Sequence, residues 1–107
     1  MVWNIIVFET SRGEKPVEDF IKSLGESTIA KVAHEIDLLE KHGPRLSMPH
    51  SKKLTADLYE LRIRGKQEIR IIYSFIKNSI YLLHAFKKQK QQTPRKEIET
   101  ALKRLRL

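Results

Sequence analysis

Apolar and polar positions alternate most clearly in the second half of the chain. Residues 58–63, 69–75 and 79–85 are rich in Ile, Leu and Tyr and alternate with a period of two. Turn-forming sequences separate them: Arg64-Gly65-Lys66-Gln67 follows the first, and Lys77-Asn78 follows the second, where asparagine tolerates positive φ. The pattern therefore predicts three consecutive antiparallel strands joined by short turns, a meander.

A fourth strand is predicted near the start of the chain. Residues 2–8 form a β-branched and aromatic run that ends at a polar stretch. We expect this strand to join the sheet of the meander. Its nearly continuous apolarity indicates burial on both faces.

Two helices follow, with the spacing of apolar residues that one buried face requires. The first begins near Pro16, which suits an opening helical turn, and ends at Gly25. The second begins near Ser27, a plausible N-cap, runs to about Lys41 and is stopped by Gly43-Pro44. We expect an antiparallel helical hairpin with an acidic outer face that covers one face of the sheet.

The remaining segments complete the predicted order. Residues 45–57 are interpreted as a loop, and a last helix follows Thr93 as N-cap and Pro94 as first helical residue. The order is β-α-α-β-β-β-α. The predicted fold class is thus α+β, a small antiparallel β-sheet packed by an N-terminal helical hairpin.

Length and composition limit the possibilities further. The 107 residues suffice for one domain with one core, so residues 1–107 are taken as a single domain. There is no cysteine, and no apolar run approaches the roughly 20 residues of a membrane span. We expect a protein of the cytoplasm with no membrane partner.

The net charge of +8 is unevenly placed along the chain. Residues 9–41 hold 5 basic and 8 acidic residues, whereas residues 84–107 hold 8 basic and 2 acidic ones. Basic small proteins are common, and many of their cations only solvate a surface. The asymmetry nevertheless favours a polyanionic or acidic partner for the second half.

Two arginines of the meander point to where such a partner binds. Alternation places Arg62 on the same strand face as Leu58 and Glu60, and Arg70 on the less apolar face of the next strand. If the hairpin register allows, Arg62 and Arg70 lie side by side. Lysines follow the third strand, so we expect a polyanion site at this rim of the sheet.

The histidines and the connecting loop leave alternatives open. His34 and His42 are interpreted as solvent-facing helix residues, because no ligand spacing such as HExxH is present. His50, Lys52 and Lys53 lie in the loop before the meander, which either reaches a bound ligand or is a solvated connector.

An ordered series of segments resembles a known family. Leu58-Tyr59-Glu60-Leu61-Arg62, Ile69-Arg70-Ile71-Ile72-Tyr73, Leu82-Leu83-His84-Ala85-Phe86-Lys87-Lys88 and Gln92-Thr93-Pro94 with Glu97-Ile98 and Ala101 resemble the HigB branch of the RelE/ParE toxin superfamily, the phage-derived-protein-like group. The resemblance implies the toxin of a type II toxin–antitoxin pair. It implies a ribosome-dependent endoribonuclease that cleaves mRNA and is neutralised by a helix-turn-helix antitoxin, with DNA contacted only through the antitoxin complex.

The resemblance also implies residue roles. Such enzymes need no metal or cofactor, because the RNA 2′-hydroxyl attacks the adjacent phosphate and basic side chains stabilise the charge. Arg70 is then the arginine at the scissile phosphate, and Arg62 binds phosphate or helps proton transfer. Lys87 and Lys88 match a basic cluster that stabilises the oxyanion or the RNA backbone. His84 is either an acid or base or a packing residue, and the further candidate RNA contacts are Lys52, Lys53, Lys66 and Lys90.

The chain departs from the family pattern at its end. Many RelE-like ribonucleases carry a tyrosine or histidine there as general base, and residues 89–107 contain neither. The general acid and base therefore stay unassigned. Two alternatives remain open, a ParE-like DNA gyrase inhibitor without nuclease activity and a non-catalytic nucleic-acid-binding module.

Overall fold

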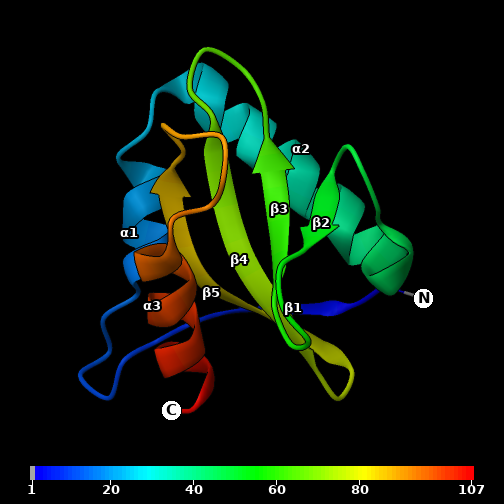
Figure 1. Cartoon of the computed structure of the whole chain (residues 1–107), viewed down its shortest axis with the longest axis vertical. Helices are drawn as coiled ribbons and strands as arrows, with labels where there is room; N and C mark the ends of the chain where they lie inside the picture. Colours follow the sequence, from blue (N-terminus) through cyan, green and yellow to red (C-terminus); the bar gives the residue numbers. More distant parts are fainter. Residues whose placement is uncertain (1) are drawn as a thin grey trace.

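The computed structural model describes residues 2–107, and within them a five-stranded sheet lies between helices on both faces (Figure 1). The strands are β1 (Asn4–Val7), β2 (Ser51–Lys53), β3 (Tyr59–Ile63), β4 (Ile69–Ile76) and β5 (Ser79–Lys87). The helices are α1 (Pro16–Lys22), α2 (Glu26–His42) and α3 (Arg95–Leu105), with a short 3₁₀ turn, η1 (Gly43–Arg45). The predicted mixed α+β class is confirmed.

The meander is confirmed, whereas the purely antiparallel sheet is wrong. The strand order is β1-β5-β4-β3-β2, in which β2 to β5 pair antiparallel and β1 pairs parallel to β5. Apolar periodicity does not encode the direction of pairing, so the parallel edge could not be predicted from the pattern. Because β1 is an edge strand, it is only half-buried rather than covered on both faces.

The predicted order also lacked one strand. Residues 45–57, interpreted as a loop, contain β2, whose Ser51 pairs with Leu61 of β3. A three-residue edge strand has too few positions to show alternation. The observed order is therefore β-α-α-β-β-β-β-α.

The two N-terminal helices lie on one face of the sheet, but they cover different strands. The seven-residue α1 packs on β5, and the longer α2 packs on β3. Their buried side chains, including Val17, Val32 and Leu39, join Leu61, Ile71 and other inward residues in the larger apolar cluster. The expected hairpin thus differs in detail.

Helix α3 covers part of the other face (Figure 1). Its Ala101 packs against Leu58 of the strand entry, Ile72 of β4 and Leu83 of β5 in the second apolar cluster. A register irregularity opposite Ile72 and Tyr73 lets both Leu83 and His84 turn toward α3. Beyond the N-terminal end of α3, the same sheet face carries the charged side chains of Glu60, Arg62 and Arg70 instead of apolar ones.

Four local predictions need correction and three are confirmed. Helix α1 ends at Lys22 with Ser23 as C-cap, not at Gly25. Helix α2 begins at Glu26 with Gly25 as N-cap, not at Ser27, and α3 begins at Arg95 with Pro94 as N-cap, not with Thr93. The positive φ of the β4–β5 turn falls on Lys77 (55°) rather than on the asparagine. The helix start at Pro16, the helix stop at Gly43-Pro44 and the exposure of His34 and His42 are as predicted.

Candidate functional site: a basic face of the sheet

The register of β3 and β4 brings the two meander arginines together. Arg62 lies directly opposite Arg70, and Glu60 lies one step along β3 on the same face. Side chains of adjacent residues, such as Leu61 and Ile71, enter the core on the other face. The expected side-by-side placement of Arg62 and Arg70 is therefore confirmed.

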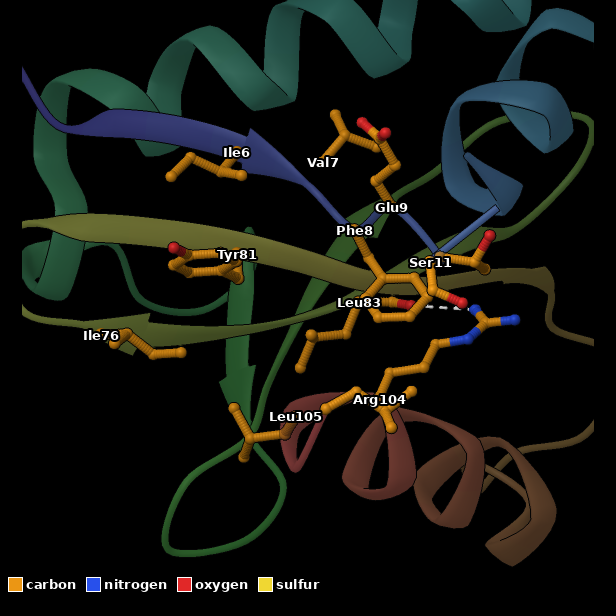
Figure 2. Close-up of a pocket in the computed structure, with 12 residues that line it drawn as sticks. Ile6, Val7, Phe8, Glu9, Ser11, Ile76, Tyr81, Leu83, Arg104 and Leu105 are labelled. Atoms are coloured by element: carbon orange, nitrogen blue, oxygen red, sulfur yellow. Dashed lines mark hydrogen bonds between the residues drawn. The ribbon is translucent and has the colours of Figure 1, made fainter. Parts of the chain in front are cut away.

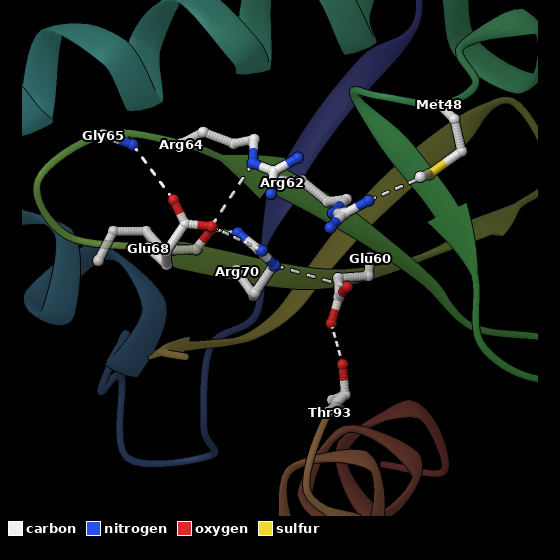
Figure 3. A network of polar contacts seen from close by, with 9 residues as sticks. Met48, Glu60, Arg62, Arg64, Gly65, Glu68, Arg70 and Thr93 are labelled. Atoms are coloured by element: carbon white, nitrogen blue, oxygen red, sulfur yellow. Dashed lines mark hydrogen bonds and ion pairs between the residues drawn. The ribbon is translucent and has the colours of Figure 1, made fainter. Parts of the chain in front are cut away.

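Arg70 is held tightly rather than extended into solvent (Figure 3). Its side chain is only 2% exposed. Its Nη2 lies 2.9 Å from Glu68 Oε1, and its Nη1 donates to the carbonyl oxygen of Ile69 at 3.0 Å. Its Nε lies 3.6 Å from Glu60 Oε1, too far for a hydrogen bond. Two carboxylates and a carbonyl thus fix the guanidinium in place.

Glu60 is the most buried acid of this network. Its side chain is 1% exposed, and its Oε2 accepts a short hydrogen bond from the hydroxyl of Thr93, in the segment before α3 (Figure 3). Among residues 2–107, its Oε1 has no hydrogen-bond partner, and neither has Nε of Arg70 or of Arg62. Thr93 therefore serves Glu60 instead of capping the helix.

Arg62 is the more accessible of the two arginines. It is half-buried, and its Nη1 lies 3.2 Å from the Met48 sulfur (Figure 3). Its backbone N–H donates to the carbonyl oxygen of His50, which anchors the loop before β2. The His50 ring itself is bound to Glu35 of α2 at 2.9 Å. His50 is thereby engaged in holding the loop to the helix.

The adjacent residues Lys52 and Lys53 of β2 lie on opposite faces of the sheet. Lys52 pairs with Glu60 across β2 and β3 and so lies on the arginine face, whereas Lys53 pairs with Tyr59 and lies 5.9 Å from the centre of its ring. We call Lys52, Arg62, Arg70 and Lys88 the basic sheet face.

Neighbouring charged groups shift the pKa of the Lys88 ammonium. Burial lowers its pKa, and nearby Arg70, Arg62 and Lys52 lower it further, whereas Glu60 acts in the opposite direction; the net shift is downward. The backbone N–H of Lys88 donates to the carbonyl oxygen of Glu68 at 2.7 Å. The influence of Glu60, Arg62, Arg70 and Lys52 on its pKa groups Lys88 with the residues of the basic sheet face.

Lys87 lies elsewhere. It pairs with Ile69, whose side chain enters the α1 and α2 core, and it lines a separate cavity of about 640 Å³. Lys90 lines the same cavity, together with Phe20, Arg95 and Lys96. Lys66 is exposed in the turn between β3 and β4. The structure thus gathers some of the predicted basic residues and separates Lys53, Lys66, Lys87 and Lys90 from them.

His84 is engaged beneath α3. Its Nε2 lies 2.8 Å from Glu97 Oε1, and its Nδ1 lies 3.3 Å from Nη1 of Arg104. On β4, Ile72 lies between His84 and Glu60 in the cross-strand row. These contacts dock α3 onto β5 and agree with the packing alternative for His84.

A second surface feature lies at the opposite end of α3. A groove of about 770 Å³ runs between β1, β5 and the last turn of α3, and Arg104 crosses it to donate to the carbonyl oxygen of Leu83 at 2.9 Å (Figure 2). Its lining is largely apolar: Ile6, Phe8, Ile76, Tyr81, Leu83 and Leu105. The groove carries none of the predicted site residues.

Alternation placed Glu60 on the face of Arg62, but the contacts of Glu60 and Glu68 with Arg70 were not predicted. Glu60 in β3 and Glu68, just before β4, stand two positions before Arg62 and Arg70, so strand alternation would put each on the face of an arginine. This i, i+2 spacing of opposite charges was a usable signal. Thr93 gave none, because its contact with Glu60 joins residues 33 positions apart.

The arrangement suits recognition of an anion. Lys52, Arg62 and Lys88 retain accessible positive charge around a fixed Arg70, and arginine presents paired donors to phosphate oxygens. Within residues 2–107, no three His, Asp or Glu side chains converge as a metal site would require. In the same part of the chain, no helix is long and apolar enough to cross a membrane.

Fold and site together define a small α+β protein with a basic face on its sheet. A family model described as phage-derived protein Gp49-like (DUF891) matches residues 19–106, which is most of the chain. The chain therefore belongs to the Gp49-like family of phage-derived proteins. No curated protein sequence matches it significantly.

Proposed function

We propose that this protein is the toxin of a type II toxin–antitoxin pair and acts as a ribosome-dependent mRNA endoribonuclease of the RelE/HigB type. The observation that carries the proposal is the convergence of Lys52, Arg62, Arg70 and Lys88 on one sheet face. Membership in the Gp49-like family and the resemblance of the strand motifs support it.

The proposed reaction uses the substrate's own nucleophile. The RNA 2′-hydroxyl attacks the adjacent phosphorus, the bond to the 5′-oxygen breaks, and a cyclic phosphate and a 5′-hydroxyl result. Arg62 and Lys88 stabilise the additional negative charge on the phosphate oxygens, and Lys52 contacts the neighbouring backbone. Arg70 is fixed between Glu60 and Glu68 and supports the other cations from the buried side of the site.

The proposed partner is a helix-turn-helix antitoxin that places acidic or apolar groups over the basic sheet face. Its contact with the cluster blocks access of RNA. A partner footprint confined to the acidic outer surface of α1 and α2 would contradict this mode of inhibition.

The test is induced expression in bacterial cells followed by mapping of mRNA 5′ ends. Wild-type protein is expected to arrest growth and to produce new ends in reading frame, and Arg62→Ala is expected to abolish them. Arg62 suits the test better than the buried Arg70, because its truncation leaves no buried acid unpaired. Cleavage by purified protein on ribosomes is expected to persist in EDTA.

A second candidate function is inhibition of DNA gyrase without RNA cleavage. The burial of Arg70 at 2% exposure favours it, because a scissile phosphate does not reach this guanidinium without movement of its neighbours. Growth arrest with intact mRNA and inhibited supercoiling by purified gyrase would select this candidate over the nuclease.

A further inference from the structure

The groove between β1, β5 and the last turn of α3 exposes apolar side chains of the sheet (Figure 2). Cross-strand pairing places Ile6 of β1 beside Tyr81 of β5, and both residues are only half-buried. Ile76, at the end of β4, is 38% exposed on the same lining. Helix α3 covers the neighbouring part of this face, around Leu83. The groove is therefore an apolar hollow that no element of residues 2–107 fills.

The size and lining of the groove resemble those of small-molecule sites. Its volume is about 770 Å³, within the range of roughly 300–1,000 Å³ in which such sites lie. They are mostly apolar and hold a few polar groups that orient the ligand. The charged side chains on this lining are Glu9 and Arg104. Glu9 lies 4.0 Å from the Lys15 ammonium, so Arg104 is the group available to a ligand.

Arg104 is fixed in the groove but lacks an acidic partner. Its Nη1 donates to the carbonyl oxygen of Leu83 at 2.9 Å, and its guanidinium carbon lies 5.2 Å from the centre of the Phe8 ring (Figure 2). Within residues 2–107 it forms no ion pair with a carboxylate. Burial lowers the pKa of Arg104, because a cation removed from water is disfavoured unless it is paired. An anion in the groove would supply the missing pair.

The charges around the groove favour a ligand with one acidic group. Lys103 and Arg106 are exposed beside Arg104 at the end of α3. A second copy of this chain would bring these cations against the same cations, because a two-fold contact joins identical surfaces. A nucleic acid strand requires several cations along its path, whereas this lining holds a single arginine among apolar side chains. The lining therefore fits one negative group attached to an apolar body.

We propose that this groove binds a small amphipathic carboxylate, whose carboxylate pairs with Arg104 and whose apolar body lies along Ile6, Tyr81 and Leu105. The two contacts of Arg104 within the chain both use Nη1, which leaves Nη2 and Nε for the ligand. Arginine suits a carboxylate because its planar fork of N–H donors binds both oxygens. The site is separate from the basic sheet face, and the inference does not depend on the proposed nuclease function.

The first experiment is an NMR titration of the full-length protein with sodium octanoate, followed through the backbone amide signals. Saturable shifts are expected for Phe8, Leu83 and Arg104. Octan-1-ol has the same chain without the charge, and acetate has the charge without the chain. Both are expected to bind at least about tenfold more weakly than octanoate. Shifts confined to the basic sheet face, or equal affinity for octanoate and octan-1-ol, would overturn the proposal.

The second experiment removes the cation. Arg104→Gln is expected to weaken octanoate binding at least about tenfold, because a hydrogen bond to a charged group is lost. The matched control is Arg106→Gln, which removes the same charge from an exposed residue next to the end of α3 that does not line the groove. This control is expected to bind octanoate as wild type does. Equal affinity in both variants would show that Arg104 does not hold the carboxylate and would overturn the proposal.

Ile76→Ser keeps the test decisive if Arg104→Gln does not fold, because Ile76 is partly exposed and its replacement disturbs little packing. This variant is expected to weaken octanoate binding about threefold or more through lost apolar contact. Its control is Val2→Ser, which changes an apolar residue that is 64% exposed and lies outside the lining. Equal octanoate affinity in these two variants would overturn the proposal. A wild-type dimer in sedimentation that Ile76→Ser abolishes would assign the groove to a second copy and would overturn it as well.

Discussion

Arg62 and Arg70 lie directly opposite one another on β3 and β4, yet only Arg70 is buried and clamped between two glutamates. The two arginines of the basic sheet face therefore differ in accessibility. Arg70 is fixed on the buried side of the pair, whereas Arg62 is half-buried and is the more accessible of the two guanidinium groups.

The first prediction concerns the stability of the two arginine variants. Arg70→Ala leaves Glu60 buried without its nearest cation and is expected to lower the free energy of unfolding by about 3–5 kcal/mol. Arg62→Ala removes a half-exposed side chain and is expected to cost less than about 1 kcal/mol. Urea denaturation of both variants measures the difference. Equal losses would show that the buried network does not stabilise the fold.

The second prediction concerns Tyr73, whose phenol lies 2.5 Å from the Ser51 hydroxyl in the core beneath β2. Burial raises the pKa of Tyr73 to about 12, against an opposing effect of the Ser51 hydrogen bond. A raised pKa favours the neutral phenol in the folded state. Its contribution to stability is therefore complete below pH 10 and is lost as the pH rises from 10 toward 12.

Spectrophotometric titration tests this directly, because the chain has three tyrosines. Tyr73 is expected to stay un-ionised in the folded protein as the pH rises past 10. In Tyr73→Phe the delayed ionisation is expected to disappear, and the Ser51 hydroxyl loses its partner at a cost of about 1 kcal/mol. A wild-type titration with no delayed tyrosine would contradict the burial of this phenol.

The alternation of the meander made its strands, faces and arginine register predictable. Side chains of period two fix which residues share a face, and the short turns between β3, β4 and β5 leave little freedom in register. Arg62 beside Arg70 follows from these two constraints alone. The exposure of His34 and the helix stop at Gly43 likewise depend on local sequence.

The features that were missed depend on contacts between distant segments. The parallel pairing of β1 with β5 and the pairing of β2 with β3 join segments at the two edges of the meander, and local sequence does not encode these contacts. The burial of Arg70 depends on Glu60, Glu68 and Thr93 arriving from three segments. Lys87 and Lys88 looked equivalent in sequence, because the end of a strand does not reveal which lysine follows the arginine face.

The third prediction concerns Gly43, the residue that ends α2. Its φ of 51° lies in the left-handed region, and a Cβ there would lie 2.2 Å from the Trp3 indole nitrogen. Gly43→Ala is therefore expected to lower the free energy of unfolding by about 2–3 kcal/mol. Gly25→Ala is the control, because no atom lies within 4 Å of its added Cβ and its φ is −68°. Thermal unfolding of both variants tests this, and similar midpoints would contradict the close approach of Trp3.

The fourth prediction uses the neighbouring lysines as matched pairs. Lys52 and Lys88 belong to the basic sheet face, whereas Lys53 and Lys87 pair with residues whose side chains enter the opposite core. Each comparison removes one positive charge one residue apart, so the net charge of the protein is the same in both members. Any difference between them therefore reports position rather than overall charge.

Lys88→Ala is expected to lower ribosome-dependent mRNA cleavage at least about a hundredfold, because a group that stabilises developing charge contributes roughly 3 kcal/mol. Lys87→Ala is expected to change cleavage less than about threefold, and Lys52→Ala is expected to weaken RNA binding more than Lys53→Ala. Cleavage rates and RNA affinities at two salt concentrations measure these effects, since loss of one phosphate contact reduces the salt dependence. Equal effects within each pair would mean that RNA approaches the edge of the sheet without distinguishing its faces, and the basic sheet face would not be the site.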